Sequence, residues 1–153
     1  MLSYFIRSLL LSLCLLPLLS STASAGEPPI YVSFFNKVAV SGYDPVAYFT
    51  EQKAVKGDAK FKTTYKDVQW HFSSAENRDR FLANPEKYAP QYGGYCAWAV
   101  SQGDTASADP QRWKIVDGKL YLNYDADVQK KWEAGMSAFI KTADQNWPAV
   151  LGK

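Results

Sequence analysis

The chain has 153 residues, of which 47% are hydrophobic and 15% aromatic, and its formal net charge is +2. A chain of this length corresponds to one ordinary domain with a single core. The nearly balanced charge argues against a nucleic-acid-binding protein, because such proteins carry a basic face.

Residues 1–25 have the three-part layout of a secretory signal peptide. Arg7 supplies a positive charge, Leu9–Leu19 is nearly all apolar, and Ala23-Ser24-Ala25 is an A-x-A cleavage signal. The apolar run is too short for a membrane span, so an uncleaved anchor is the less favoured alternative. We expect cleavage after Ala25 and export, in a bacterium to the periplasm. Cleavage leaves Cys96 as the only cysteine, which precludes an intramolecular disulfide.

Residues 26–153 are expected to form a single α+β domain. In it, a small antiparallel sheet of hairpins carries a capped central helix and a C-terminal amphipathic helix packed on it. Nothing in this stretch is apolar for long enough to cross a bilayer. The sequence shows no internal repeat and no low-complexity run.

The first part of the domain is predicted to be a turn followed by a hairpin. Glycine, aspartate and proline in Gly42–Pro45 specify a turn, and Val46–Phe49 continues it as a short strand or helical turn. The β-rich runs Phe61–Tyr65 and Val68–Phe72 read as a hairpin. Alternation in the second run points His71, the only histidine, away from the main apolar face.

Two helices are predicted next. Ser73 and Glu76 have the spacing of a capping box, which would start a helix that runs to about Ala83. Asn84 then caps a second short helix with Pro85 at its first position, and Tyr88 packs beneath it.

The last part combines a glycine-rich segment, a hairpin and a helix. Tyr92–Val100 contains two glycines and is ambiguous between helix and strand. Trp113–Val116 and Lys119–Tyr124 flank Asp117-Gly118, a dipeptide typical of a type I′ hairpin turn. One apolar stripe then predicts a single C-terminal helix, in which Gly135 costs about 1 kcal/mol relative to alanine. The stripe consists of Val128, Trp132, Met136, Phe139 and Ile140.

Residues 42–90 resemble the YHS domain family. The resemblance rests on two motifs at a consistent distance, and the matching residues are Asp44, Pro45, Val46, Phe72, Ser74, Phe81, Asn84, Pro85, Glu86 and Tyr88. Residues 91–153 look like the extension found in exported members. The family is associated with metal ions through its cysteines, but here Ala47, Ser73 and Asn77 stand at the cysteine positions. A four-ligand zinc site is therefore excluded, because residues 26–153 offer one cysteine and one histidine.

Three residues are candidate metal ligands. Cys96 and His71 would suit Cu(I) or another soft metal if the fold brings them together, and Asp44 would add an oxygen ligand. The alternatives are that Cys96 is a small buried hydrophobic residue, that His71 lies on the surface and that Asp44 serves the turn.

An aromatic pocket beside the two glycines is the other candidate site. Its walls would be Tyr43, Tyr48, Tyr92, Tyr95 and Trp98. The alternative is that these rings pack in the core with their hydroxyl groups at its rim. A third possibility is a contact patch of exposed aromatic residues for a protein partner.

A catalytic role is not expected. A cysteine nucleophile at Cys96 would need a lowered thiol pKa and contact with His71, and the sequence indicates neither. We therefore expect an exported binding module that holds copper or another soft metal through a lone thiolate. The alternative is a structural, small-ligand or partner-binding module that uses the aromatic pocket.

Overall fold

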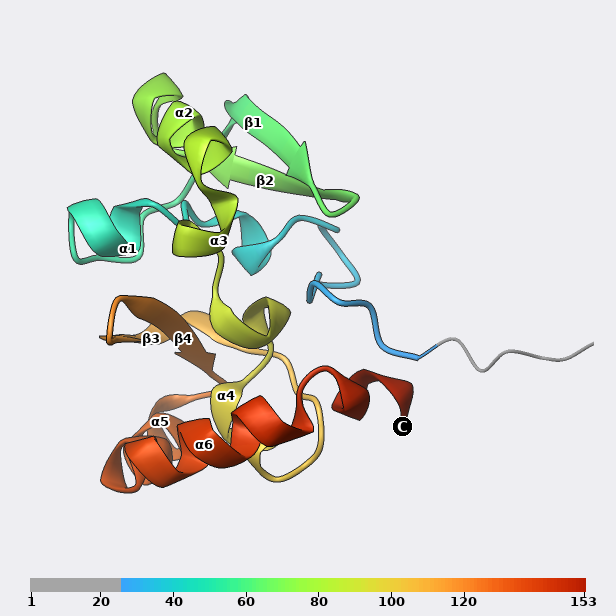
Figure 1. Cartoon of the computed structure of the whole chain (residues 1–153). Coiled ribbons are helices and arrows are strands. Elements are labelled where there is room, and N and C mark those ends of the chain that lie inside the picture. Colours follow the sequence, from blue (N-terminus) through green and yellow to red (C-terminus); the bar gives the residue numbers. More distant parts are fainter. Residues whose placement is uncertain (1–25) are drawn as a thin grey trace, which may run out of the picture.

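The computed structural model describes residues 26–153, so the predicted signal peptide lies outside the described residues. This part contains six α-helices and two two-stranded antiparallel sheets, which confirms the α+β class (Figure 1). The helices are α1 (Ala47–Thr50), α2 (Ala75–Ala83), α3 (Pro85–Tyr88), α4 (Ala97–Ser101), α5 (Ala126–Ala134) and α6 (Met136–Asn146). The strands are β1 (Asp58–Tyr65), β2 (Val68–Phe72), β3 (Asp109–Val116) and β4 (Lys119–Asn123).

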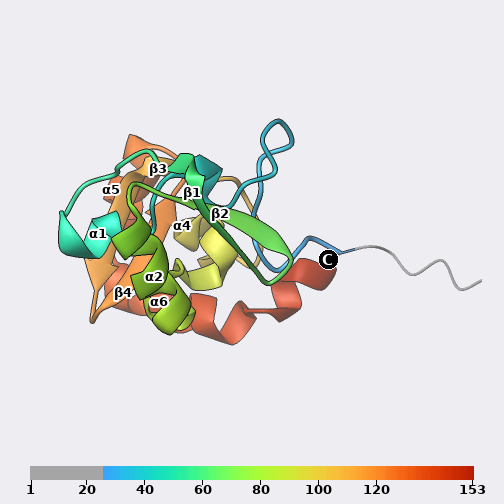
Figure 2. The same cartoon turned by 90° about the horizontal axis from the view of Figure 1, so that it is seen from above.

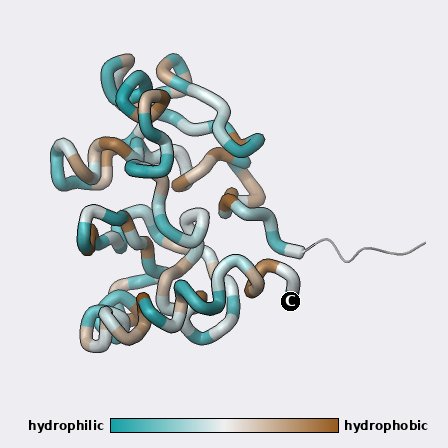
Figure 3. Tube along the Cα trace, viewed as in Figure 1, coloured by the Kyte–Doolittle hydropathy of each residue, from teal (hydrophilic) through white to brown (hydrophobic). Residues whose placement is uncertain are grey.

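Apolar stretches along this part of the chain are short and alternate with polar ones (Figure 3). Among residues 26–153, no helix is both long enough and apolar enough to cross a membrane.

The two hairpins do not join into one sheet, in contrast to the expected single sheet. The hairpin β1–β2 lies in the upper layer of Figure 1 with α1, α2 and α3, whereas β3–β4 lies in the lower layer with α4, α5 and α6. Seen from above in Figure 2, the layers overlap. Strand β4 contributes side chains to two hydrophobic clusters, because successive side chains of a strand point to opposite faces. Leu120 and Leu122 join one hydrophobic cluster with Trp70, whereas Tyr121 joins a second with Trp132.

The two layers repeat one supersecondary unit, although the sequence itself shows no internal repeat. Each unit has a turn, a short helix, a hairpin and a longer helix. Strand β1 spans 58–65 and β3 spans 109–116, a displacement of 51 residues, and the same displacement relates β2 to β4 and α2 to α5. The strand registers match as well, including an irregularity after the first residue of β1 and of β3. We call residues 40–83 the first unit and residues 92–134 the second unit.

Details of the backbone follow the same correspondence. Three successive residues have positive φ at the start of each unit, namely 40–42 in the first and 92–94 in the second. Ser74 caps α2 by accepting from the N–H of Asn77, and Asp125 caps α5 by accepting from the N–H of Val128. Phe81 and Trp132 occupy equivalent helix positions and are both fully buried. Burial of such a ring stabilises the fold by about 1.5–3 kcal/mol.

Both predicted hairpins are confirmed. Their two-residue turns, Lys66-Asp67 and Asp117-Gly118, have positive φ at both positions, as a type I′ turn requires. The short helix α3 is also confirmed, because Asn84 accepts from the N–H of Lys87 and Pro85 is the first residue.

The predicted cap at Ser73 is wrong by one residue. Ser74 is the residue that caps α2, whereas the N–H and hydroxyl groups of Ser73 both donate to the Asp44 carboxylate. Because Ser73 is hydrogen-bonded to the distant Asp44, the adjacent Ser74 is the serine that caps α2.

The predicted single C-terminal helix is interrupted at Gly135, where α5 ends and α6 begins. A β-carbon on Gly135 would lie 2.9 Å from the Phe139 ring, so the ring packs against the glycine backbone. The predicted apolar stripe still faces the second cluster, with Trp132 fully buried and Met136, Phe139 and Ile140 packed against that cluster.

Gly93 provides a test of how the second unit holds the N-terminal arm. Its φ is +61°, a β-carbon there would collide with the carbonyl oxygen of Pro29, and its own carbonyl oxygen accepts from the N–H of Tyr31 at 2.9 Å. Gly93→Ala should lower the free energy of unfolding by about 2–4 kcal/mol, through backbone strain and loss of this hydrogen bond.

Gly118→Ala is the matched control, because Gly118 also has a positive φ but nothing lies near its missing side chain. It should cost about 1–2 kcal/mol through strain alone. Urea unfolding followed by circular dichroism measures both, and equal losses would contradict the close approach at Gly93.

Candidate functional site

Asp44 is at the centre of the first unit. It is fully buried, and its carboxylate accepts hydrogen bonds from five donors. Oδ1 accepts from the N–H groups of Val46 at 2.8 Å and Ala47 at 3.3 Å. Oδ2 accepts from the N–H of Ser73 at 2.8 Å, the hydroxyl of Ser73 at 2.7 Å and Nδ2 of Asn77 at 2.7 Å. These donors satisfy the hydrogen-bonding capacity of the buried carboxylate. Asp44 therefore stabilises the turn, and its oxygens are not free to bind a metal ion.

The three positions at which the resemblance implies cysteines all surround this carboxylate. Ala47 and Asn77 donate to it, and Ser73 lies between them, with its Oγ 3.2 Å from Nδ2 of Asn77. A soft metal ion needs thiolate or imidazole ligands, and this cluster has neither. The residues present in the first unit therefore do not fit the metal site that the family resemblance implies.

Cys96 occupies in the second unit the place that Asp44 has in the first. Both residues follow a glycine-tyrosine pair, Gly42-Tyr43 or Gly94-Tyr95, and the N–H of each donates across the unit, to Val55 or Ala106 respectively. The backbone N–H groups of Trp98, Ala99 and Tyr124 approach the Cys96 sulfur. Their counterparts, Val46, Ala47 and Ser73, are the backbone donors to Asp44.

The second unit leaves this place open. A pocket of about 230 Å³ is lined by Cys96, Trp98, Ala99, Ala106, Tyr124 and Val128; we call it the Cys96 pocket. Tyr124 and Val128 stand at the positions that correspond to Ser73 and Asn77. They do not reproduce the side-chain hydrogen bonds that Ser73 and Asn77 donate to Asp44. The space that polar side chains fill around Asp44 is therefore an apolar pocket beside Cys96.

The surroundings of Cys96 keep its thiol neutral. Burial raises the pKa of the Cys96 thiol, while the N–H groups of Ala99, Tyr124 and Trp98 act in the opposite direction. The thiol donates to Oδ1 of Asn123 at 3.8 Å, and Trp98 N–H donates to the same oxygen at 3.4 Å. Nδ2 of Asn123 is buried without a partner among the described residues.

The structure does not place His71 beside Cys96. His71 lies on β2 in the upper layer, whereas Cys96 immediately precedes α4 in the lower layer (Figure 1). Nε2 of His71 is 2.9 Å from Oε1 of Gln69. Partial burial lowers the pKa of His71, and the nearby Lys62 and Lys56 lower it further. Within residues 26–153, no three cysteine, histidine or carboxylate side chains are grouped so that they could hold a metal ion.

The predicted aromatic residues do not line one common pocket. Tyr43 and Tyr48 pack with the first hydrophobic cluster, whereas Tyr92, Tyr95 and Trp98 pack with the second. Tyr48 donates to the carbonyl of Pro110 at 2.9 Å, Tyr92 to Asp144 at 2.8 Å and Tyr95 to the carbonyl of Pro28 at 2.9 Å. Of these residues, Trp98 contributes to the Cys96 pocket.

Sequence reasoning missed most of the pocket wall. Ala106, Tyr124 and Val128 carry no motif of their own, and they lie in the loop before β3, directly after β4 and in α5 respectively. The available signal was the recurrence of a glycine-tyrosine pair at Gly42-Tyr43 and Gly94-Tyr95. A recurring pair of residues is too short to identify a repeat from the sequence alone, before the strand registers are known.

The Asp44 cluster makes a direct prediction about stability. Asp44→Asn keeps the size of the side chain, but it replaces one carboxylate oxygen with an NH₂ group. That group cannot accept the hydrogen bonds that the oxygen accepted. We expect the free energy of unfolding to fall by about 3 kcal/mol. Asp79→Asn, at an exposed position of α2, is the control and should leave stability nearly unchanged. Equal stability of both variants in urea unfolding would show that the five donors contribute little.

Comparison of the sequence with known protein families finds a match that covers most of the first unit. The family model of the YHS domain matches residues 46–92. No curated protein and no solved structure matches the chain. The matched segment includes α1, the first hairpin, α2 and α3, and it ends where the second unit begins. Residues 46–92 are therefore identified as a YHS domain, which confirms the family resemblance for this part of the chain.

Proposed function

We propose that the chain is a non-catalytic binding module whose ligand occupies the Cys96 pocket. The observation that carries this proposal is the contrast between two equivalent places. Around Asp44 the space is filled by Ser73 and Asn77, whereas around Cys96 it is open. Burial raises the pKa of the Cys96 thiol, and His71, the only imidazole, lies in the other layer. Both observations favour ligand binding over nucleophilic catalysis.

The ligand that we favour is a soft metal ion such as Cu(I), which prefers sulfur and low coordination numbers. Cys96 supplies one sulfur ligand, and the other pocket residues supply no second thiol or imidazole. The second ligand is then brought by the incoming species, for example a small thiol or a donor protein. Such a half-complete site suits transfer of the metal better than permanent storage. Since binding displaces the thiol proton, affinity should fall as the pH is lowered.

We also propose that the chain is exported, in a bacterium to the periplasm, after cleavage behind Ala25. This rests on the layout of residues 1–25, with a positive charge, an apolar run and a small-residue cleavage signal. An exported thiol with no intramolecular partner is available to a metal ion and not consumed in a disulfide.

A second candidate is a small apolar ligand without metal. The observation that favours it is the chemistry of the wall, where Trp98, Ala99, Ala106, Tyr124 and Val128 surround a single protonated thiol. Apolar walls with few polar groups are typical of small-molecule sites.

Anaerobic titration with Cu(I), supplied together with a small thiol as the second ligand, tests the metal proposal on the purified protein and on Cys96→Ala. We expect one equivalent of copper in the wild type and none in the variant, because no other cysteine lies within residues 26–153. His71→Ala is the control and should retain the metal, since His71 lies on the other hairpin. Unchanged copper retention in Cys96→Ala would exclude this site.

Indole, followed by ¹H–¹⁵N NMR, tests the apolar candidate. Val128→Phe should fill the pocket and abolish the shift changes, whereas Cys96→Ala should preserve or enlarge them. Loss of indole binding in Cys96→Ala would instead assign the effect to the thiol. Leu82→Phe, at an exposed position of α2, controls for the added ring.

A further inference from the structure

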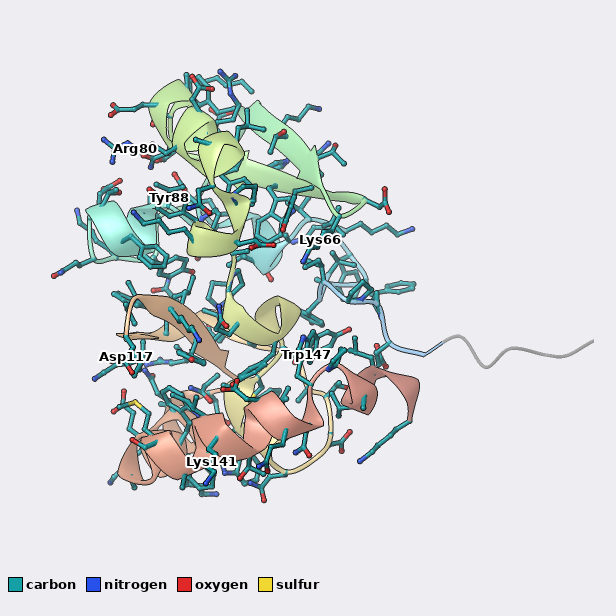
Figure 4. The ribbon with its side chains drawn as sticks, in the orientation of Figure 1. Lys66, Arg80, Tyr88, Asp117, Lys141 and Trp147 are labelled. Carbon is teal, nitrogen blue, oxygen red and sulfur yellow. The ribbon has the colours of Figure 1, made fainter. Side chains whose placement is uncertain are left out.

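A second cavity lies between the two layers. It has a volume of about 370 Å³, and we call it the interlayer groove; its walls include Tyr65, Lys66, Glu86, Tyr92, Gly93 and Trp147. In Figure 4, Lys66 lies on the upper side and Trp147 on the lower side of the space between the layers. The groove is separate from the Cys96 pocket, with which it shares no wall residue.

Four segments that are distant in the sequence build this groove. They are the N-terminal arm, the turn of the first hairpin, the segment from α3 to Gly93 and the residues after α6. Two hydrogen bonds fix part of this wall: Tyr31 N–H donates to the carbonyl of Gly93, and the Tyr92 hydroxyl donates to the Asp144 carboxylate of α6. A groove held on several sides in this way is largely preformed, which is typical of small-molecule sites.

The walls combine flat rings with unused polar groups. Tyr65, Tyr92 and Trp147 present aromatic surface, and the Trp147 ring packs 5.9 Å from that of Tyr92. Among the described residues, the hydroxyl of Tyr65 and the indole N–H of Trp147 form no hydrogen bond, and neither is a buried atom without a partner. Both side chains are half-buried wall residues, so these polar groups are available to a ligand that enters the groove.

Two opposite charges complete the wall. Lys66 carries a positive charge, and its Nζ lies 5.3 Å from the centre of the Tyr65 ring. Glu86 carries a negative charge and is also a wall residue. A purely cationic ligand gains at Glu86 and loses at Lys66, and a purely anionic ligand does the reverse. A ligand with one charge of each sign gains at both.

We infer that the interlayer groove binds a small zwitterion with an aromatic ring, the chemistry of a free aromatic amino acid. The ring lies against the aromatic walls, the carboxylate faces Lys66 and the ammonium faces Glu86. Aromatic contacts supply most of the affinity, because both charged groups are exposed and exposed ion pairs contribute little. The charges instead select among ligands with the same ring.

Three ligands that share a phenyl ring test the inference. L-phenylalanine carries both charges, phenethylamine the ammonium alone and 3-phenylpropanoate the carboxylate alone. ¹H–¹⁵N NMR titrations follow the indole signal of Trp147, which is identified by its absence in Trp147→Phe. In the wild type we expect L-phenylalanine to bind about 3- to 10-fold more tightly than either analogue.

Charge-removing variants assign the two ends of the ligand. Lys66→Gln should remove the advantage of L-phenylalanine over phenethylamine, and Glu86→Gln should remove its advantage over 3-phenylpropanoate. Lys62→Gln and Glu76→Gln are exposed controls on β1 and α2, away from the groove, and should preserve both preferences. Equal binding of the three ligands to the wild type, or no shift of the Trp147 signal with any of them, would overturn the inference.

Discussion

The fully buried Asp44 carboxylate holds the first unit together, because five hydrogen bonds from three segments end on its two oxygens. These bonds join the turn before α1, the end of the first hairpin and the first residues of α2. A buried carboxylate is tolerated only when it is satisfied in this way. The position of α2, and with it the buried Phe81, therefore depends on one side chain.

The second unit uses the same backbone arrangement with different chemistry at its centre. Cys96 replaces the carboxylate, and an apolar pocket replaces the polar side chains that fill the centre of the first unit. Strand β4 joins the units, because its alternating side chains enter both hydrophobic clusters. The domain as a whole thus combines one filled centre and one open pocket.

In our proposal, this difference lets the chain bind a ligand although its YHS domain lacks the cysteines that the resemblance implies. At the positions of those cysteines the first unit has Ala47, Ser73 and Asn77, which are committed to Asp44. The remaining sulfur lies in the second unit, beyond the segment that the YHS model matches. Ligand binding in our proposal has therefore moved from the recognised domain to its structural repeat, and the interlayer groove adds a site that neither unit forms alone.

Local signals in the sequence determined the secondary structure and the family. Both hairpins follow from β-rich runs around two-residue turns, and α3 follows from Asn84-Pro85, because these preferences act between near neighbours. The tertiary structure decided the rest. Ser74 and not Ser73 caps α2, because the Ser73 hydroxyl donates to the distant Asp44 carboxylate. The repeat and the Cys96 pocket also required the fold, because few equivalent positions hold the same residue, and backbone hydrogen bonds and strand register reveal their correspondence.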